Sequence, residues 1–115
     1  MSRPAHNGLA AGSQAYAAIF AALGDSTRLY LVTKLCDGQS YSISQLTETT
    51  ALTRQAITKH LRVLEGARIV SSSRTGRENR FSFNLDPIDD LRTYLAVVSV
   101  QWDQALARLR HFVEA

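Results

Sequence analysis

The sequence predicts a mainly helical α+β domain, in which four helices precede a β-hairpin and one long helix ends the chain. Three patterns support this order. Apolar residues recur three and four positions apart through residues 14–64, which is the spacing of amphipathic helices. Alternating apolar and polar residues then run from Asn79 to Leu85, after a turn at Thr75–Glu78. An apolar stripe close to a heptad repeat occupies residues 87–113.

The composition indicates one ordinary globular domain. The chain has 115 residues, of which 45% are hydrophobic and 20% are charged. Residues 1–13 contain a proline, two glycines and few large apolar side chains, so we expect a flexible N-terminal tail there. We expect residues 14–115 to form a single domain, whose last helix covers about residues 87–113.

Positive charge is concentrated in one part of the sequence. The whole chain has a formal net charge of +3, but the segment from Thr53 to Arg80 has seven basic residues against two glutamates, a local net charge of +5. Because neutralised phosphates release condensed counterions, this concentration favours a polyanionic partner. The basic residues of the segment are Arg54, Lys59, Arg62, Arg68, Arg74, Arg77 and Arg80.

The first two helices are bounded by capping and breaking residues. One helix runs from about Gln14 to Gly24, and either Asp25 or Ser26 caps the next. The pair Asp37–Gly38 ends this second helix.

Two short helices joined by a tight turn follow. Ser42 and Gln45 are spaced as a capping box at the start of the first, which ends near Thr49, and Thr53 is a natural N-cap for the second. Apolar residues of the second helix, such as Ile57, recur at core-facing intervals. Its opposite face therefore presents polar side chains that can reach phosphates and base edges: Arg54, Gln55, Thr58, Lys59 and Arg62.

The hairpin joins two strand-like runs, Ile69–Arg74 and Asn79–Leu85. Arg74, Arg77 and Arg80 lie on or beside its tip. We therefore expect the hairpin to project positive charge outward.

The last helix is expected to start at Asp86 as N-cap, with Pro87 at the first helical position. A helix this long and apolar overhangs any core that so small a chain can build, so we expect it to bury its surplus against a second subunit. Its seam is formed by Ile88, Leu91, Leu95, Val98, Trp102, Ala105, Leu109 and Phe112.

Three stretches follow one another along the chain: Leu23–Asp25 with Thr27–Arg28, the run Gln55–Leu61 with Leu64, and Gly76–Arg77 in the hairpin turn. In this order and spacing they resemble the ArsR/SmtB family of winged helix-turn-helix repressors. The resemblance implies four helices, two strands and a final helix, with dimerisation through the first and last helices. It also implies insertion of the fourth helix into the major groove of double-stranded DNA.

The resemblance assigns residues to two surfaces. The implied DNA-binding set is Thr53, Arg54, Gln55, Thr58, Lys59, His60, Arg62, Arg74, Arg77 and Arg80. The implied dimer interface contains Ile19, Phe20, Leu91, Leu95, Val98, Trp102, Leu106 and Leu109.

This sequence departs from the family pattern at two kinds of position. Metal-sensing members have a cysteine pair in the third helix, where Ser42–Thr47 here contains none, and His111 with Glu114 supplies only half of the alternative ligand set. We therefore expect no metal and no cofactor, and an unidentified small-molecule effector stays open. Arg68 occupies a position that is usually glycine, and a left-handed backbone there costs about 1 kcal/mol unless Gly66 shifts the helix end.

These observations predict a sequence-specific DNA-binding regulator, a repressor that binds a palindromic operator as a homodimer. The alternative is a winged-helix protein–protein interaction module without DNA binding. An enzyme is not expected, because the chain has no spaced acid, base and nucleophile and no glycine-rich phosphate loop. A single cysteine, no apolar membrane span and no secretory signal predict a cytoplasmic protein without a membrane partner.

Overall fold

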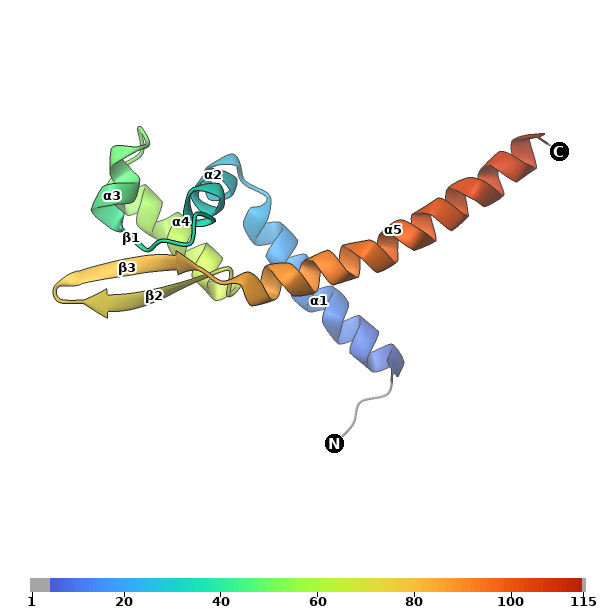
Figure 1. Cartoon of the computed structure of the whole chain (residues 1–115), viewed down its shortest axis with the longest axis horizontal. Helices are drawn as coiled ribbons and strands as arrows, with labels where there is room; N and C mark the ends of the chain where they lie inside the picture. The colour runs from blue at the N-terminus through green and yellow to red at the C-terminus, as the bar shows by residue number, and fades with distance from the viewer. Residues whose placement is uncertain (1–4, 115) are drawn as a thin grey trace. The chain divides into compact units, whose positions relative to one another are not determined.

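The computed structural model describes residues 5–114, and the side chains of residues 14–114. Contacts divide the chain into two compact units, Met1–Leu85 and Asp86–Ala115. Figure 1 shows the helices and strands of both units in chain order. Among the described residues, no helix combines the length and the apolar content that crossing a bilayer requires.

The first unit contains the predicted helices and hairpin in the predicted order (Figure 1). It adds one element, the two-residue strand β1, which is too short to give an alternating sequence pattern. The elements are α1 (Ala5–Leu23), α2 (Ser26–Leu35), β1 (Tyr41–Ser42), α3 (Ile43–Glu48), α4 (Arg54–Gly66), β2 (Val70–Thr75) and β3 (Glu78–Phe83).

The strands form one antiparallel sheet in the order β1-β3-β2. Thr75 pairs with Glu78, so Gly76 and Arg77 alone make the turn between β2 and β3. Gly76 has a φ of 63°, the positive value that tight hairpin turns require and that glycine adopts without strain. On the other edge of β3, Tyr41 pairs with Phe81 and joins the start of α3 to the hairpin.

The start of α1 differs from the sequence prediction. Of the expected flexible tail over residues 1–13, residues 1–4 lie outside the described residues, and residues 5–13 belong to α1. The prediction weighted the two glycines of this stretch, whereas its three alanines are the strongest helix formers.

The core of the first unit is aliphatic and is centred on α4. Helices α2 and α3, the strand β2 and the residue before it pack their apolar side chains together with those of α4. Full burial of each such side chain contributes about 1.5–3 kcal/mol to folding. The fully buried residues are Leu31, Leu35, Leu46, Ile57, Leu61, Leu64, Ile69 and Val70.

Helix α4 ends in the left-handed turn that the sequence analysis anticipated. Arg68 has a φ of 64°, so Gly66 does not relieve it. The Arg68 amide donates to the Glu65 carbonyl at 3.0 Å, and the Ile69 amide donates to the Leu64 carbonyl at 3.0 Å. This pair of bonds is the Schellman arrangement, which satisfies the last carbonyls of the helix but favours glycine at the position of Arg68.

The second unit consists of the helix α5 (Leu85–Glu114), which is 30 residues long and whose first residue is counted with the first unit. It begins slightly before the predicted start, so Asp86 lies in the first turn instead of capping it. Pro87 is tolerated there because the first amides of a helix have no partner within the helix. A helix of this length spans about 45 Å.

Replacing Arg68 with glycine should raise the stability of the protein. Glycine adopts a positive φ without strain, and after subtraction of its greater freedom in the unfolded chain the gain should be about 0.5–1 kcal/mol. Urea denaturation measures this as a higher midpoint. The Arg68→Ala variant is the matched control, since it removes the side chain but keeps the strained backbone. An equal gain in both variants would assign the effect to the arginine side chain instead.

Candidate nucleic-acid interface

Helix α4 presents a polar face because its apolar residues fix its rotation. Ile57, Leu61 and Leu64 are four and three positions apart and have no accessible surface, so they hold one side of the helix in the core. The opposite side is exposed at Arg54, Gln55, Lys59 and Arg62, as the sequence predicted.

The N-terminal end of this face is held by local hydrogen bonds. The Thr53 hydroxyl accepts from the Ala56 amide at 3.1 Å, which confirms Thr53 as the N-cap of α4. One turn later the Thr58 hydroxyl donates to the Arg54 carbonyl at 2.7 Å. This bond turns the Thr58 hydroxyl toward the backbone and leaves its methyl group for an outside contact.

Arg54 is oriented by a residue that the sequence analysis did not single out. Its guanidinium donates to the Ser44 hydroxyl of α3 at 2.5 Å. The two residues are ten positions apart, beyond the reach of helix-periodicity arguments. A residue of α3 thus holds the side chain of Arg54, the first residue of α4, in place.

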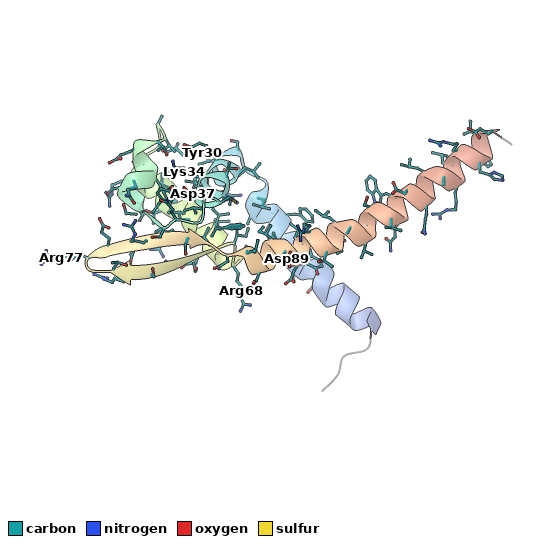
Figure 2. The ribbon with its side chains drawn as sticks, in the orientation of Figure 1. Tyr30, Lys34, Asp37, Arg68, Arg77 and Asp89 are labelled. Carbon is teal, nitrogen blue, oxygen red and sulfur yellow. The ribbon has the colours of Figure 1, made fainter. Side chains whose placement is uncertain are left out.

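The β2–β3 hairpin supplies a second basic element. Arg74 and Arg77 are exposed, and Figure 2 shows Arg77 at the hairpin tip. Neither side chain has a hydrogen bond or ion pair with another described residue. Both remain available to an external anion.

Arg80 lies beside the hairpin tip, as predicted, but its side chain has partners inside the protein. Its guanidinium donates to the Ser40 hydroxyl at 3.0 Å and to the Ser40 carbonyl at 2.8 Å. It also forms an ion pair with Glu78 at 3.1 Å, and its side chain is only 25% exposed. Arg80 therefore ties the hairpin to the segment before β1, and its donors are largely used inside the protein.

His60 also lies away from the exposed face of α4. Its Nδ1 lies 3.3 Å from the Arg28 guanidinium and 3.7 Å from the Asp25 carboxylate, both near the start of α2. The structure thus places His60 in helix packing. The sequence alone left both environments open, because His60 lies between Lys59 on the polar face and Leu61 on the apolar face.

Asp25 and Arg28, from the first of the three stretches that resemble the ArsR/SmtB family, have structural roles at the junction of α1 and α2. The Asp25 carboxylate accepts from the Arg28 amide at 3.0 Å and is the N-cap of α2, one of the two residues predicted for this role. The Arg28 side chain donates to the carbonyls of Ala22 at 2.5 Å and Ala21 at 3.3 Å, at the end of α1. This pair joins α1, α2 and, through His60, α4.

The same hydrogen bond perturbs the titration of Asp25. The Arg28 amide, aided by the charge of the Arg28 guanidinium and by His60, lowers the pKa of Asp25 below its ordinary value of 3.8. The ionised carboxylate is therefore the form that the folded chain favours.

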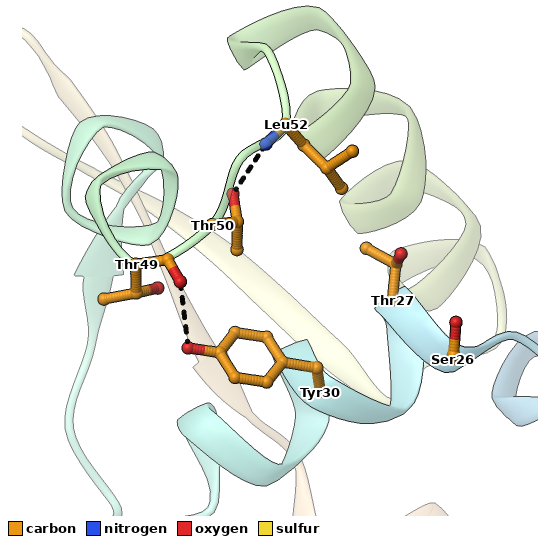
Figure 3. A pocket seen from close by; sticks show the side chains of 6 residues that line it. All are labelled: Ser26, Thr27, Tyr30, Thr49, Thr50 and Leu52. Carbon is orange, nitrogen blue, oxygen red and sulfur yellow. Dashed lines mark hydrogen bonds between the residues drawn. The ribbon is translucent and has the colours of Figure 1, made fainter.

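A hydroxyl-rich pocket of about 260 Å³ lies where α2 meets the turn between α3 and α4 (Figure 3). In it the Tyr30 hydroxyl donates to the Thr49 carbonyl at 3.4 Å, and the Leu52 amide donates to the Thr50 hydroxyl at 3.3 Å. These bonds fix the turn that leads into α4. The lining residues are Ser26, Thr27, Tyr30, Thr49, Thr50 and Leu52.

The residues predicted for a dimer interface fall into two groups. Ile19 and Leu91 are 7% and 6% exposed, so they have little surface left for a partner. Val98 is half-buried, and the others are exposed: Phe20, Leu95, Trp102, Leu106 and Leu109. Among the described residues, no group of three or more His, Cys, Asp or Glu side chains gathers as a metal site would.

A polar helix held beside a basic β-hairpin, after a helix and a tight turn, defines the winged helix-turn-helix class of DNA-binding proteins. Comparison with known proteins agrees. Residues 25–72 match the family described as bacterial regulatory protein, arsR family. A relative from Bacillus subtilis (strain 168), the uncharacterized HTH-type transcriptional regulator YuzN, is 41% identical over 80 residues, which cover 64% of this chain and 87% of the relative.

Solved structures give the same result. An ArsR-like transcriptional regulator from Rhodococcus sp. RHA1 is 33% identical, with a TM-score of 0.75 over 87% of this chain and 93% of that one. NolR from Sinorhizobium fredii shares the fold, with 19% identity and a TM-score of 0.61 over 89% of this chain and 96% of that one. The chain belongs to the ArsR family of transcriptional regulators, and it is a DNA-binding regulator, not an enzyme.

Substituting Asp25 with asparagine should flatten the acid limb of the stability profile. Because folding lowers the pKa of Asp25, its contribution is complete above 3.8 and is lost as the pH falls through the lower folded value. Asparagine still caps α2 but does not titrate. The free energy of unfolding, measured by urea titration between pH 2 and 6, should therefore fall less steeply below about pH 4 in Asp25→Asn than in the natural protein.

A Glu48→Gln variant is the control for that measurement. Glu48 is an exposed carboxylate without a hydrogen bond to another described residue. This variant also removes one carboxylate, so the comparison shows how much of the change in Asp25→Asn belongs to the hydrogen-bonded carboxylate of Asp25. Identical profiles for the natural protein and Asp25→Asn would refute the role given to this carboxylate.

Proposed function

We propose that this protein is a repressor that binds an imperfect palindrome in promoter DNA as a homodimer, in the cytoplasm, where the DNA lies. The observation that carries the proposal is the exposed polar face of α4 beside Arg74 and Arg77 of the hairpin, which are exposed and have no partner among the described residues. Promoter occlusion by the bound dimer then prevents transcription.

In this proposal α4 enters the major groove, whose width accepts a helix. Gln55, Arg54 and Lys59 contact base edges or the phosphates beside them, and Thr53, Thr58 and Arg62 flank them on the same helix. Gln55 is the best candidate for direct readout, because its amide pairs with adenine through two hydrogen bonds.

The hairpin contributes affinity more than sequence preference. Arg74 and Arg77 contact the flanking backbone or the minor groove, where a positive charge binds every sequence. Arg80 serves this contact indirectly, since its bonds to Ser40 hold the hairpin in place. His60 likewise supports α4 from the protein side.

The homodimer is supported by the apolar surface of α5. Leu95 is 44% exposed and Trp102 is 68% exposed, and both line one apolar depression of about 380 Å³ on this helix. Exposed apolar residues repeated along one helix are typical of an association surface. A second copy is the occupant that fits, because a two-fold interface pairs the same surface on both subunits.

Alanine substitutions at Gln55 and Arg77 should separate specificity from affinity. Gln55→Ala should lower the preference for a selected operator over mixed-sequence DNA by about 5- to 150-fold, the worth of one bidentate base contact. Arg77→Ala should weaken binding to the operator and to mixed-sequence DNA by the same factor, and should reduce the salt dependence of the affinity. Fluorescence anisotropy with operators selected from random duplexes measures both effects.

The natural protein is the reference for that experiment. If it makes 6–10 phosphate contacts, its affinity for DNA should fall by roughly 10³ to 10⁵ between 50 and 200 mM salt. A chain that shows no affinity for any duplex in dilute buffer would instead be a protein–protein interaction module. Equal loss of specificity in Gln55→Ala and Arg77→Ala would refute the division of roles.

Glutamate at position 102 should convert the dimer into a folded monomer. Trp102 is 68% exposed in the single chain, so the substitution leaves the core of the chain intact but places a charge in the proposed seam. Sedimentation should show half the natural mass, and circular dichroism should show unchanged helix content. Gln104→Glu adds the same charge about half a turn away and should remain dimeric, whereas a dimeric Trp102→Glu would remove Trp102 from the interface.

A further inference from the structure

A polar groove of about 180 Å³ lies between α3, α4 and the hairpin tip. It is formed within the first unit by residues from three places in the sequence. These are the start of α3, the first residue of α4 and the β2–β3 turn with its neighbours. The lining residues are Ser42, Ile43, Ser44, Arg54, Arg77, Glu78 and Asn79.

The charges in this groove favour an anion. The lining contains two arginines, Arg54 and Arg77, and one acidic residue, Glu78. The Glu78 carboxylate accepts from the Arg80 guanidinium at 3.1 Å, which neutralises it within the protein. The two lining arginines therefore leave an excess of positive charge, and the volume exceeds the roughly 30 Å³ of one water molecule several-fold.

The two arginines are prepared differently. Arg54 is held by the Ser44 hydroxyl, itself part of the lining, and so loses less side-chain freedom when an anion arrives. Arg77 has no partner among the described residues and can turn toward the same anion from the hairpin. A guanidinium matches two oxygens of a phosphate at once, so two of them can grip one group from opposite sides.

We propose that this groove holds a single phosphodiester group of the bound DNA, shared by Arg54 and Arg77, with Ser44 as a positioning residue for Arg54. The inference rests on the proposed function and adds to it that the helix and the hairpin grip one common phosphate. Helix α4 and the hairpin then both contact the DNA backbone at the same phosphate.

The dependence of affinity on salt tests this sharing. Each phosphate neutralised on B-DNA contributes about 0.9 to the slope of log affinity against log salt. Arg54→Ala and Arg77→Ala together should reduce the slope by about 0.9 per subunit if they share one phosphate, and by about 1.8 if they bind two. The probe is a 30-base-pair duplex of mixed sequence, titrated with the full-length protein and its variants.

A second pair of arginines is the matched control. Arg62 is exposed on α4 but does not line the groove. The shared phosphate is held only when both guanidinium groups grip it, so Arg77→Ala alone already releases it, and Arg62 contacts a phosphate of its own. The Arg62→Ala and Arg77→Ala combination should therefore lose about 1.8 per subunit. In affinity, the Arg54 and Arg77 substitutions should together cost less than the product of their separate factors, whereas the control pair should be multiplicative.

Ser44 is tested through Arg54. Ser44→Ala should weaken DNA binding several-fold in the natural background and have no further effect in Arg54→Ala, and Ser44→Thr should restore binding. A purely structural role for Ser44 would produce the same loss in both backgrounds and would overturn the positioning role.

Three outcomes are distinguishable. A natural protein that does not bind the duplex at all refutes the proposed function. Steep, salt-dependent binding with a slope change of about 1.8 for Arg54 and Arg77 refutes only the shared phosphate. Calorimetric binding of inorganic phosphate alone, lost in the Arg54 and Arg77 double variant, would make the groove a site for a free anion and overturn its assignment to DNA. The expected result is no detectable binding of inorganic phosphate.

Discussion

The rotation of α4 about its own axis is the constraint on which the proposed DNA-binding surface depends. Ile57, Leu61 and Leu64 have no accessible surface and hold one side of the helix in the aliphatic core. Rotating the helix would expose these side chains and bury charged ones, at a cost of several kcal/mol. The same packing that stabilises the first unit therefore decides which side chains face outward. The polar face of α4 is thus exposed because the apolar face is buried in the core.

Two arginines extend this constraint to the rest of the first unit. Arg28 joins the carbonyl end of α1 to His60 on α4, and Arg80 joins the hairpin to Ser40. An arginine has five donors in a rigid fork, so one side chain can satisfy backbone carbonyls from one element and a partner from another. Charge near a DNA-binding surface is thus of two kinds: Arg77 is free to meet a phosphate, whereas Arg80 holds the element that carries Arg77.

The sequence predicted what local interactions decide. The Ser42–Gln45 capping box and the Thr53 cap were predictable because each partner lies three residues away. The inward position of His60 and the bonds of Arg80 were not, since their partners lie 32 and 40 residues away. The strained Arg68 was anticipated from a family pattern. The hydrogen bond between Ser44 and Arg54 could not be predicted from the sequence, because neither helical periodicity nor composition singles out a surface serine.

The exposed stripe of α5 connects the energetics of association with DNA recognition. A single exposed apolar side chain is ordinary, but repetition along one helix leaves a large area whose burial contributes about 25 cal/mol per Å². Under the proposed pairing, that burial fixes two copies of α4 at the separation of successive major grooves, about 34 Å. Binding of one half-site then makes the second an intramolecular event, which raises affinity without a new base contact. In the proposed dimer, apolar residues outside the proposed DNA contacts, Trp102 among them, would thereby contribute to the choice of operator through the spacing they impose.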